Sequence, residues 1–492
     1  MITDDRPVGW AVPTNLATMN RSFDAIVIGS GPNGLAAAIA IAQQKRSVLV
    51  LEAQPTLGGG ARTAELTLPG FLHDICSAIH PMALASPFLS SLPLANFGLE
   101  WIHPPAPLAH PLDDGTAAVL ERDLDATATG LGTDDPAYRR LMHHLTTHSQ
   151  PLFAEALGPL RLPRHPILMA RFGLLAIRSA QSLANTHFKQ PAAKALIAGL
   201  AGHSVLPLEA RLSAAVAIML GIAGHAVGWP VARGGSQSIT NALVNYLKSL
   251  GGEVLTGCRV ESLNNLPPAK AYLFDTSPSS LAEICKDSLP ERFRQQLTRF
   301  RHGPGVFKLD WALSQPIPWR AKECHRAATI HLGGTLEEIT AAESQVHRGE
   351  HPERPYILVA QQSLFDDTRA PAGKHVAWAY CHVPAYSTLD MTDTIERQIE
   401  RFAPGFRDCI LAKTAMAPAD MQRHNANYIG GDISGGMLDF WQLFTRPTVR
   451  LSPYTTPNRQ IYICSSSTPP GGGVHGMCGY FAAQAALRRT RR

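Results

Sequence analysis

The chain has 492 residues, of which 45% are hydrophobic and 17% are charged, and its formal net charge is +5. This length exceeds one simple core and predicts a globular protein with two interleaved domains. The arginines are scattered and form no basic stripe with interleaved aromatic residues, which argues against a nucleic-acid partner.

The eight cysteines form no CxxC or CxxxxC pair. Their spacing argues against a redox-active disulfide and a cysteine zinc site, and we predict no metal site. Reduced cysteines are typical of a cytoplasmic protein. The first residues are polar and acidic and contain no apolar core of a secretory signal. We interpret residues 1–21 as an extension, either an upstream start before Met19 or a disordered arm.

The most informative segment joins a strand, a glycine turn, a helix and a second strand. Apolar residues 25–28 lead into a GSGPNG turn, a helical pattern spans residues 35–44, and apolar residues 47–51 end on Glu52. This order is the dinucleotide-binding fingerprint in its expected setting. The residues that we assign to the cofactor site here are Gly29, Ser30, Gly31, Pro32, Asn33, Gly34, Glu52 and Ala53.

Each glycine of this turn has a physical reason. Gly29 permits the tight turn, Gly31 lets a pyrophosphate approach the backbone, and Gly34 lets the helix pack on the strand. The phosphates then face free N–H groups at the start of the helix. Glu52 is expected to accept hydrogen bonds from the adenosine ribose.

Residues 88–230 form an insertion with a mostly helical pattern. Phe172 and Leu175 lie three apart on one face of an expected helix, where they would line a tunnel for an apolar substrate. Residues 212–229 just reach the length of a membrane span, but their alanine and glycine content favours a buried helix. The insertion also carries arginines that would face a membrane surface or, alternatively, form the solvated face of a cap: Arg161, Arg164, Arg171 and Arg178.

The remaining chain alternates between the two expected domains. Residues 231–300 contain a glycine turn, a helix over 239–250 and strands over 253–255 and 271–275. Residues 301–436 contain strands over 306–313, 356–360 and 376–382. Residues 437–492 contain a strand over 460–464, a glycine-rich turn and a closing helix that begins near Val474. Residues 22–87, 231–300 and 437–492 are therefore assigned to a cofactor-binding domain, and 88–230 and 301–436 to a substrate domain with a helical cap.

Four motifs together resemble one family. They are the fingerprint ending at Glu52, the segment GGGART at 58–63, the segment GFLHDICSAIHP at 70–81 and the segment TPPGGGVHGMCGY at 468–480. The chain is similar to the phytoene-desaturase-like FAD-dependent oxidoreductases, in the branch of phytoene dehydrogenase-related and pyridine nucleotide-disulfide oxidoreductase domain-containing 2 proteins. The resemblance covers nearly the whole chain from Phe23. It implies an α/β fold: a Rossmann-like, glutathione-reductase-type FAD-binding domain interleaved with a mixed-sheet substrate domain and helical cap.

The resemblance also implies further contacts with FAD. Arg62 stands two residues after the position where many relatives carry an arginine, and is either a phosphate ligand or a surface charge. Ser465 replaces a glycine and either binds the ribityl chain or phosphate, or is satisfied in a local turn. No second GxGxxG unit directly follows a strand elsewhere in the sequence, which argues against a separate NAD(P) domain. The residues that the resemblance adds to the FAD site are Gly59, Gly60, Ala61, Arg62, Val260, Ser465, Gly473, Val474 and Met477.

Two histidines are candidates for proton transfer. His80 lies in the segment at 70–81 and His475 in the glycine-rich turn, and each is either catalytic or a satisfied structural histidine. Asp310, Tyr380 and His382, on expected strands of the substrate domain, are weaker candidates.

The leading hypothesis is an FAD-dependent dehydrogenase or desaturase that transfers hydride from a lipophilic, isoprenoid- or polyene-like substrate to flavin N5. Oxygen or a quinone would accept the electrons. A redox-neutral polyene isomerase or a saturase remains open, as does a flavin-loaded protein that binds or senses a ligand without chemistry. The sequence indicates no oligomeric state.

Overall fold

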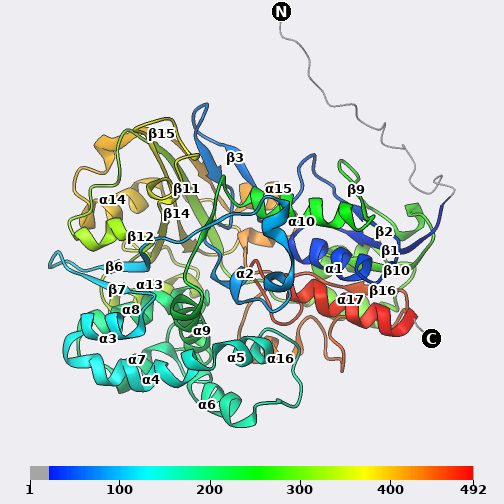
Figure 1. Cartoon of the computed structure of the whole chain (residues 1–492), viewed down its shortest axis with the longest axis horizontal. Coiled ribbons are helices and arrows are strands. Elements are labelled where there is room, and N and C mark those ends of the chain that lie inside the picture. The colour runs from blue at the N-terminus through cyan, green and yellow to red at the C-terminus, as the bar shows by residue number, and fades with distance from the viewer. Residues whose placement is uncertain (1–20, 491–492) are drawn as a thin grey trace, which may run out of the picture.

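A five-stranded parallel sheet forms one side of the molecule (right side of Figure 1). The computed structural model describes residues 21–490, so the predicted extension lies outside the described residues except for Arg21. The strands come from three separate parts of the chain, in the order β16-β10-β1-β2-β9. Their bounds are β1 (Phe23–Ile28), β2 (Val48–Leu51), β9 (Glu253–Leu255), β10 (Ala269–Phe274) and β16 (Ile461–Ile463). This sheet and its helices confirm the predicted Rossmann-like fold.

Small residues let helices pack closely on this sheet. Helix α1 (Pro32–Ala42) begins directly after the glycine turn, and nearly all of its residues are buried. It packs against α17 (Met477–Thr490) and α10 (Gln237–Ser249). A Cβ at Gly479 of α17 would overlap the carbonyl oxygen of Asn33, so only glycine permits this crossing.

A mixed seven-stranded sheet forms the second layer, at the upper left of Figure 1, in the order β15-β11-β14-β13-β12-β6-β7. All neighbours are antiparallel except β12 and β6. The bounds are β6 (Ala106–Pro111), β7 (Ala117–Leu120), β11 (Gly305–Leu313), β12 (Ala327–Leu332), β13 (Ile357–Ala360), β14 (His375–Val383) and β15 (Ile410–Met416). The sequence predicts β11, β13 and β14 but misses the other four strands. The expectation that residues 88–230 are mostly helical is therefore wrong for 101–120, where the chain forms strands.

The two faces of this sheet differ in chemistry because side chains alternate along each strand. One face is apolar and packs in a buried cluster that includes Trp311, Ile330 and Val359. The other face carries Lys308 and Asp310 on β11, and the register pairs them with Tyr380 and Trp378 on β14. We call this second side the polar face.

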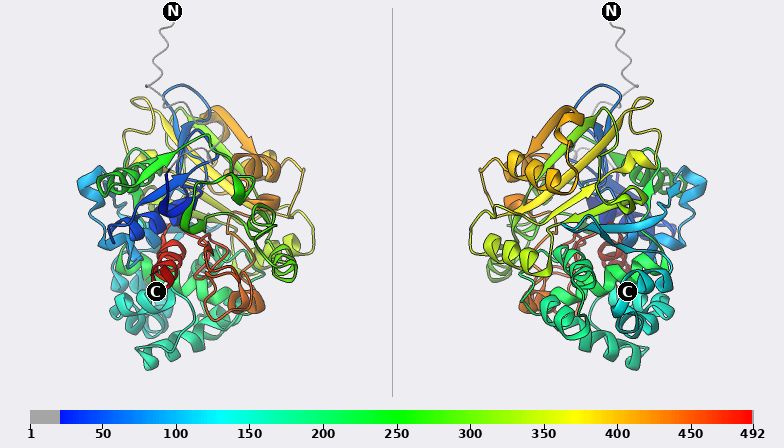
Figure 2. Two further views of the ribbon diagram at one scale, coloured as in Figure 1. Left: turned by 90° about the vertical axis from the view of Figure 1, so that its right-hand side faces the viewer. Right: turned by 90° about the vertical axis from the view of Figure 1, so that its left-hand side faces the viewer.

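Helices from residues 124–226 form one end of the molecule, seen in teal and green at the lower left of Figure 1 and below the sheets in both views of Figure 2. Their bounds are α3 (Leu124–Gly130), α4 (Asp135–Thr147), α5 (Ser149–Ala156), α6 (Pro166–Ala176), α7 (Ala180–His187), α8 (Pro191–Gly202) and α9 (Ser213–Ala226). The predicted helix over 212–229 is α9, and most of it is buried. Among residues 21–490, no single helix is long and apolar enough to cross a membrane; α6 and α7 reach that length and composition only as a pair bent by 98°.

The remaining strands form two small sheets of two strands each. Two small sheets pair β3 (Thr63–Glu65) with β4 (Leu72–Asp74), and β5 (Trp101–Ile102) with β8 (Val231–Ala232). The other α-helices of the described chain are α2 (Pro81–Ala85), α11 (Pro278–Ile284), α12 (Glu291–Thr298), α13 (Leu336–His347), α14 (Thr392–Phe402), α15 (Pro418–His424) and α16 (Phe440–Thr445).

Candidate active site

A cavity of about 1040 Å³ is lined by residues of both sheets and of the helical end. This volume is at the upper end of the range for pockets that hold one drug-sized molecule. All the predicted cofactor residues line the cavity except Gly34, Ala61 and Met477, which are buried behind its wall. His80 lines the cavity too, whereas His475 does not.

The fingerprint turn is built as its glycines require. Gly29 has a φ of +102°, which favours glycine. A Cβ at Gly34 would overlap the carbonyl oxygen of Gly29, and a Cβ at Gly31 would lie 2.6 Å from Oδ2 of Asp275. The turn therefore has no room for side chains on the side where it meets β10.

Glu52 is held in place by its neighbours at the end of β2. Its Oε2 accepts from the backbone N–H of Ser30 at 2.9 Å and from the hydroxyl of Ser30 at 2.6 Å. Its Oε1 accepts from the backbone N–H of Gln54 at 2.9 Å. A carboxylate has about four acceptor positions, so one position on Oε1 remains for a donor such as a ribose hydroxyl.

Two polar atoms near the turn fit a bound dinucleotide. The hydroxyl of Ser465 and Oδ1 of Asn33 are buried and lack a hydrogen-bond partner within residues 21–490, and both residues line the cavity. Buried polar groups are rarely left unpaired. A ligand with phosphate and hydroxyl oxygens would supply both partners, so the residues present fit FAD.

Arg62 fixes the loop between β2 and β3. Its guanidinium donates to the carbonyl oxygens of Gly59 at 2.8 Å and His424 at 2.9 Å, and to the Thr56 hydroxyl at 3.3 Å. Burial lowers the pKa of this guanidinium, and the Glu52 carboxylate opposes that shift. Arg62 is not a surface charge: it lines the cavity, where its phosphate contact stays a prediction.

The closing helix begins later than predicted. Helix α17 starts at Met477 rather than near Val474, because Gly473 and Gly476 have φ values of +124° and +67° and extend the loop. The backbone N–H of Met477 donates to Nδ1 of His475 at 3.0 Å. The expected free helix N-terminus at Val474 is therefore absent from the structure.

His475 has both ring nitrogens engaged. Because Nδ1 accepts from Met477, the proton is on Nε2, which donates to the carbonyl oxygen of Gly471 at 3.1 Å. Burial lowers its pKa to about 4. This ring closes the glycine loop and is not in contact with the cavity, so its position does not support the predicted catalytic role.

His80 lies at the cavity wall in the neutral form. The Ser236 hydroxyl donates to the carbonyl of Ser77 and therefore accepts from Nε2–H of His80, at 3.0 Å. Nδ1 then carries a lone pair and has no hydrogen-bond partner in the described chain. Burial lowers the pKa of His80 to about 4. At neutral pH this ring can accept a proton or a hydrogen bond, and its catalytic role stays a prediction.

The weaker candidates separate in space. Tyr380 lines the cavity, whereas Asp310 and His382 are buried behind it. Asp310 is paired with Lys308, and burial raises the pKa of Asp310 to about 6. His382 is paired through Nδ1 with Glu343 at 2.8 Å. Asp310 therefore belongs to a buried ion pair of the substrate sheet, and His382 to a buried hydrogen-bonded pair.

Sequence reasoning misses several residues that line the cavity. The structure adds Asp275, His203, Thr329, Trp378 and Tyr428. Asp275 follows β10 directly, so its position at the carboxyl end of a parallel strand is the signal that could have found it. Thr329 lies on β12, a strand that the sequence does not predict.

Asp275 lies beside the glycine turn with an unusual affinity for its proton. Its Oδ2 accepts from the backbone N–H of Gly34 at 2.9 Å. Burial, with a further contribution from the Glu52 charge, raises its pKa from an ordinary value of 3.8 to about 7, although the Gly34 hydrogen bond opposes this shift.

The raised pKa of Asp275 predicts that the stability of the folded protein depends on pH. The folded state holds the proton more tightly than the unfolded chain, so stability falls as pH rises from about 4 to about 7 and stays lower above pH 7. Asp275→Asn keeps an acceptor for Gly34 but cannot ionise. We expect Asp275→Asn to melt at least about 2 °C above wild type at pH 8 and close to it at pH 4. Thermal melting at both pH values checks this; an equal difference at the two would contradict it.

The other end of the cavity is apolar. Its wall includes Leu157 after α5, Phe172 of α6, and Val216 and Met219 of α9. The predicted tunnel residue Phe172 is therefore in the cavity. Leu175 is not: it packs against the main hydrophobic core instead.

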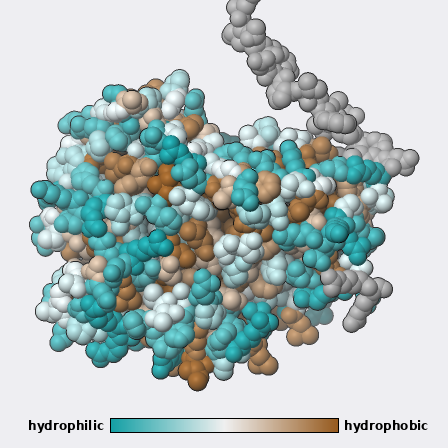
Figure 3. Space-filling model, in the orientation of Figure 1, coloured by the Kyte–Doolittle hydropathy of each residue, from teal (hydrophilic) through white to brown (hydrophobic). Residues whose placement is uncertain are grey.

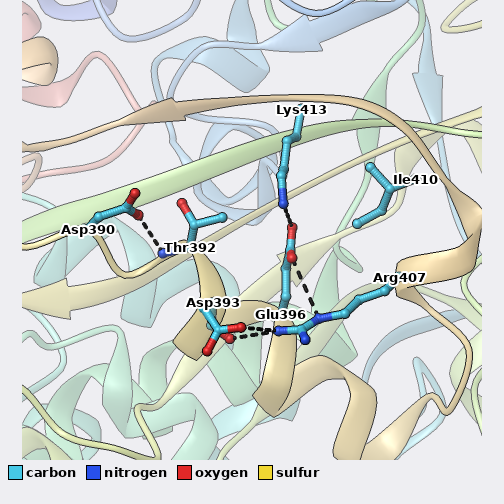
Figure 4. A pocket seen from close by; sticks show the side chains of 7 residues that line it. All are labelled: Asp390, Thr392, Asp393, Glu396, Arg407, Ile410 and Lys413. Atoms are coloured by element: carbon cyan, nitrogen blue, oxygen red, sulfur yellow. Dashed lines mark hydrogen bonds and ion pairs between the residues drawn. The ribbon is translucent and has the colours of Figure 1, made fainter.

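A second hollow, of about 630 Å³, lies at the surface near β15 (Figure 4). Glu396 lies between Lys413, at 2.7 Å, and Arg407, at 3.6 Å, and Arg407 also binds Asp393 at 2.6 Å. These charges neutralise one another. The hollow therefore offers no charged group in need of a ligand.

Comparisons with known proteins agree with this geometry. The family model of the NAD(P)-binding Rossmann-like domain matches residues 27–88. The chain is 24% identical to pyridine nucleotide-disulfide oxidoreductase domain-containing protein 2 of Rattus norvegicus, over 96% of this chain and 94% of that protein. It is 24% identical to the lycopene-forming phytoene desaturase of Pseudescherichia vulneris, over 94% and 98%.

A solved structure shows the same fold. An oxidoreductase from Methanosarcina mazei superposes with a TM-score of 0.64 at 14% identity, over 95% of this chain and all of that one. The comparisons confirm the fold class and the resemblance to phytoene-desaturase-like FAD-dependent oxidoreductases that the four motifs predict.

Proposed function

We propose that this protein is an FAD-dependent oxidoreductase that removes hydride from a lipophilic substrate. The observation that carries the proposal is the continuous cavity, which is lined at one end by the fingerprint turn and Glu52 and at the other by Phe172 and Met219. One end has the chemistry to bind a dinucleotide and the other to bind an apolar molecule.

Different residues of the cavity would bind the cofactor, bind the substrate and contact the transferred proton. Glu52 and the turn at 29–34 would hold the adenosine and pyrophosphate, while Ser465 would bind the rest of FAD. Bound FAD would supply hydride acceptance at N5 and passage of electrons to oxygen or a quinone. The apolar wall would hold the substrate and exclude water. His80, neutral and unpaired at Nδ1, would accept a hydrogen bond from the substrate; because burial lowers its pKa to about 4, it would be a weak base for the proton.

Two other functions share this cavity and stay predictions: a redox-neutral isomerase or saturase, and a flavin-loaded binding protein.

A contact with a membrane surface also stays a prediction. The side chains of Leu162, Ile167 and Leu174, on and beside α6, are more than two-thirds exposed and fit such a contact. Figure 3 shows hydrophobic residues along the lower edge of the molecule, where α6 lies in Figure 1.

The experiment that tests the proposal is identification of the cofactor. Protein purified without added flavin is expected to be yellow and to release FAD, not FMN, on denaturation. The reason is that Glu52 would bind the adenosine ribose, which FMN lacks. Chromatography of the denatured supernatant, with FAD and FMN standards, makes the measurement. Release of FMN alone, or colourless protein that does not take up added FAD, would overturn the proposal.

A further inference from the structure

Polar side chains gather at one part of the cavity wall, opposite in character to the apolar wall. Thr329 and His331 lie on the polar face of the substrate sheet, two residues apart on β12. His203, just after α8, contacts His331 and lines the cavity together with Thr329. The hydroxyl of Thr329 is buried and finds no hydrogen-bond partner among residues 21–490. We call His203 and Thr329 the polar subsite.

Two further histidines, His331 and His110, continue from His203 in a row behind this subsite. Nε2 of His203 lies 2.9 Å from Nε2 of His331. The register of β12 and β6 sets His331 beside His110, because Ile330 pairs with Ala109. A Cβ at Gly199 would lie 2.7 Å from Nδ1 of His331 and 2.9 Å from Nδ1 of His110, so these two nitrogens face the same point.

One carbonyl fixes the tautomer of His110. Nε2 of His110 lies 2.8 Å from the carbonyl oxygen of Gly334, which can only accept, so the proton of His110 is on Nε2. Nδ1 of His110 and Nδ1 of His331 are both buried and have no hydrogen-bond partner within residues 21–490, so His110 does not fix the tautomer of His331.

Nε2 of His203 and Nε2 of His331 share one hydrogen bond, in which one ring donates and the other accepts. No hydrogen bond to Nδ1 of His203 is found in the described part of the chain, and this atom carries a proton in one direction of the pair and a lone pair in the other. Burial lowers the pKa of His203 to about 3 and holds the pKa of His331 well below its ordinary value. The row is therefore neutral at pH 7, and its end in the cavity offers one ring nitrogen for a hydrogen bond.

We propose that the polar subsite binds the hydroxyl group of an amphipathic substrate, so that the molecule oxidised is a lipophilic alcohol and not a hydrocarbon. A hydroxyl both donates and accepts, so it can pair with Nδ1 of His203 in either tautomer and with the Thr329 hydroxyl, which satisfies both groups. An uncharged row disfavours a carboxylate or phosphate head, which would need a cation. This inference rests on the proposed function and names its substrate class.

The test compares matched ligands that differ only at the head group. The probes are 1-decanol, geraniol and farnesol, each with its methyl ether, titrated calorimetrically into the FAD-loaded protein. An ether oxygen can only accept, so it makes at most one of the two hydrogen bonds to His203 and Thr329. We expect at least one alcohol to bind about 10-fold more tightly than its ether, the effect of one hydrogen bond.

Two variants and one control locate the effect. His203→Phe removes the ring nitrogen, and Thr329→Val removes the hydroxyl at nearly constant volume; each is expected to reduce the preference for alcohol. His225→Phe is the control, because His225 is a buried histidine of α9 that binds Tyr138 and is not part of the cavity wall. FAD content should be unchanged in all three.

The outcomes are distinct. Alcohols and ethers that bind equally to wild type would overturn the subsite and leave the lipophilic cavity intact. A preference that survives unchanged in both Thr329→Val and folded His203→Phe would also overturn the assignment. If none of the six probes binds, both this inference and the lipophilic substrate of the proposed function fail.

Discussion

Gly31→Val is expected to abolish FAD binding while the chain still folds. Gly31 lines the cavity at the start of α1, where the pyrophosphate must approach the backbone. A Cβ there also lies 2.6 Å from Oδ2 of Asp275, so a branched side chain would be displaced into the space needed for the cofactor. We expect affinity for FAD to fall on the order of 100-fold, the effect of severe overpacking.

The measurement is the ratio of flavin to protein after purification, together with circular dichroism. Gly130→Val is the matched control, since Gly130 is the last residue of α3 and an added Cβ would meet open space. Full flavin occupancy in Gly31→Val would show that the turn does not hold the pyrophosphate.

Phe172→Asp is expected to remove binding of apolar ligands but to leave FAD in place. Phe172 lines the apolar end of the cavity, away from the fingerprint turn. A carboxylate without a partner in an apolar site costs on the order of several kcal/mol. We therefore expect affinity for geraniol or farnesol to fall about 100-fold or more, with the flavin spectrum unchanged. Flavin content, melting temperature and ligand titration are measured on the same sample.

Two variants separate the cavity from the helix. Leu175→Asp adds the same charge to the same face of α6, three residues away, but Leu175 packs against the core instead of lining the cavity. It should destabilise the fold more than it weakens ligand binding. Phe172→Leu keeps an apolar wall and should be mild. Intact ligand binding in folded Phe172→Asp would remove α6 from the substrate site.

The nucleotide-binding part of the fold is predictable because its information is local. The strand before Gly29, the turn itself and the alanine-rich start of α1 lie within 20 consecutive residues, and the apolar runs of β10 and β16 are continuous. The seven-stranded substrate sheet is less predictable from local sequence. The sequence of β6, APLAHP, has a proline near each end and few residues that favour strands.

The site shows the same difference. Most of the predicted cofactor residues that line the cavity lie in or beside a local motif, but Val260 and Ser465 lie outside all four motifs. His475 could not be placed from its motif, because its Nδ1 accepts from the first N–H of α17 and this contact depends on two positive φ angles in the loop before the helix. The polar subsite depends on the register of β12 with β6 and on the end of α8, three segments that lie between residues 106 and 332. Local sequence patterns do not encode such contacts.

The strand order of the parallel sheet has a consequence for how this protein is made. Strand β16 and helix α17 follow all the other elements along the chain, yet β16 pairs with β10 and α17 covers α1. On a translating ribosome, the turn at 29–34 emerges more than 400 residues before these partners. Domains generally fold as units during synthesis, so the cradle for the cofactor is completed only after residues 461–490 have emerged. Until then, the apolar side of α1 is exposed and needs protection from aggregation. A cofactor molecule that binds at this stage would contact the turn at 29–34 but not the residues after β16.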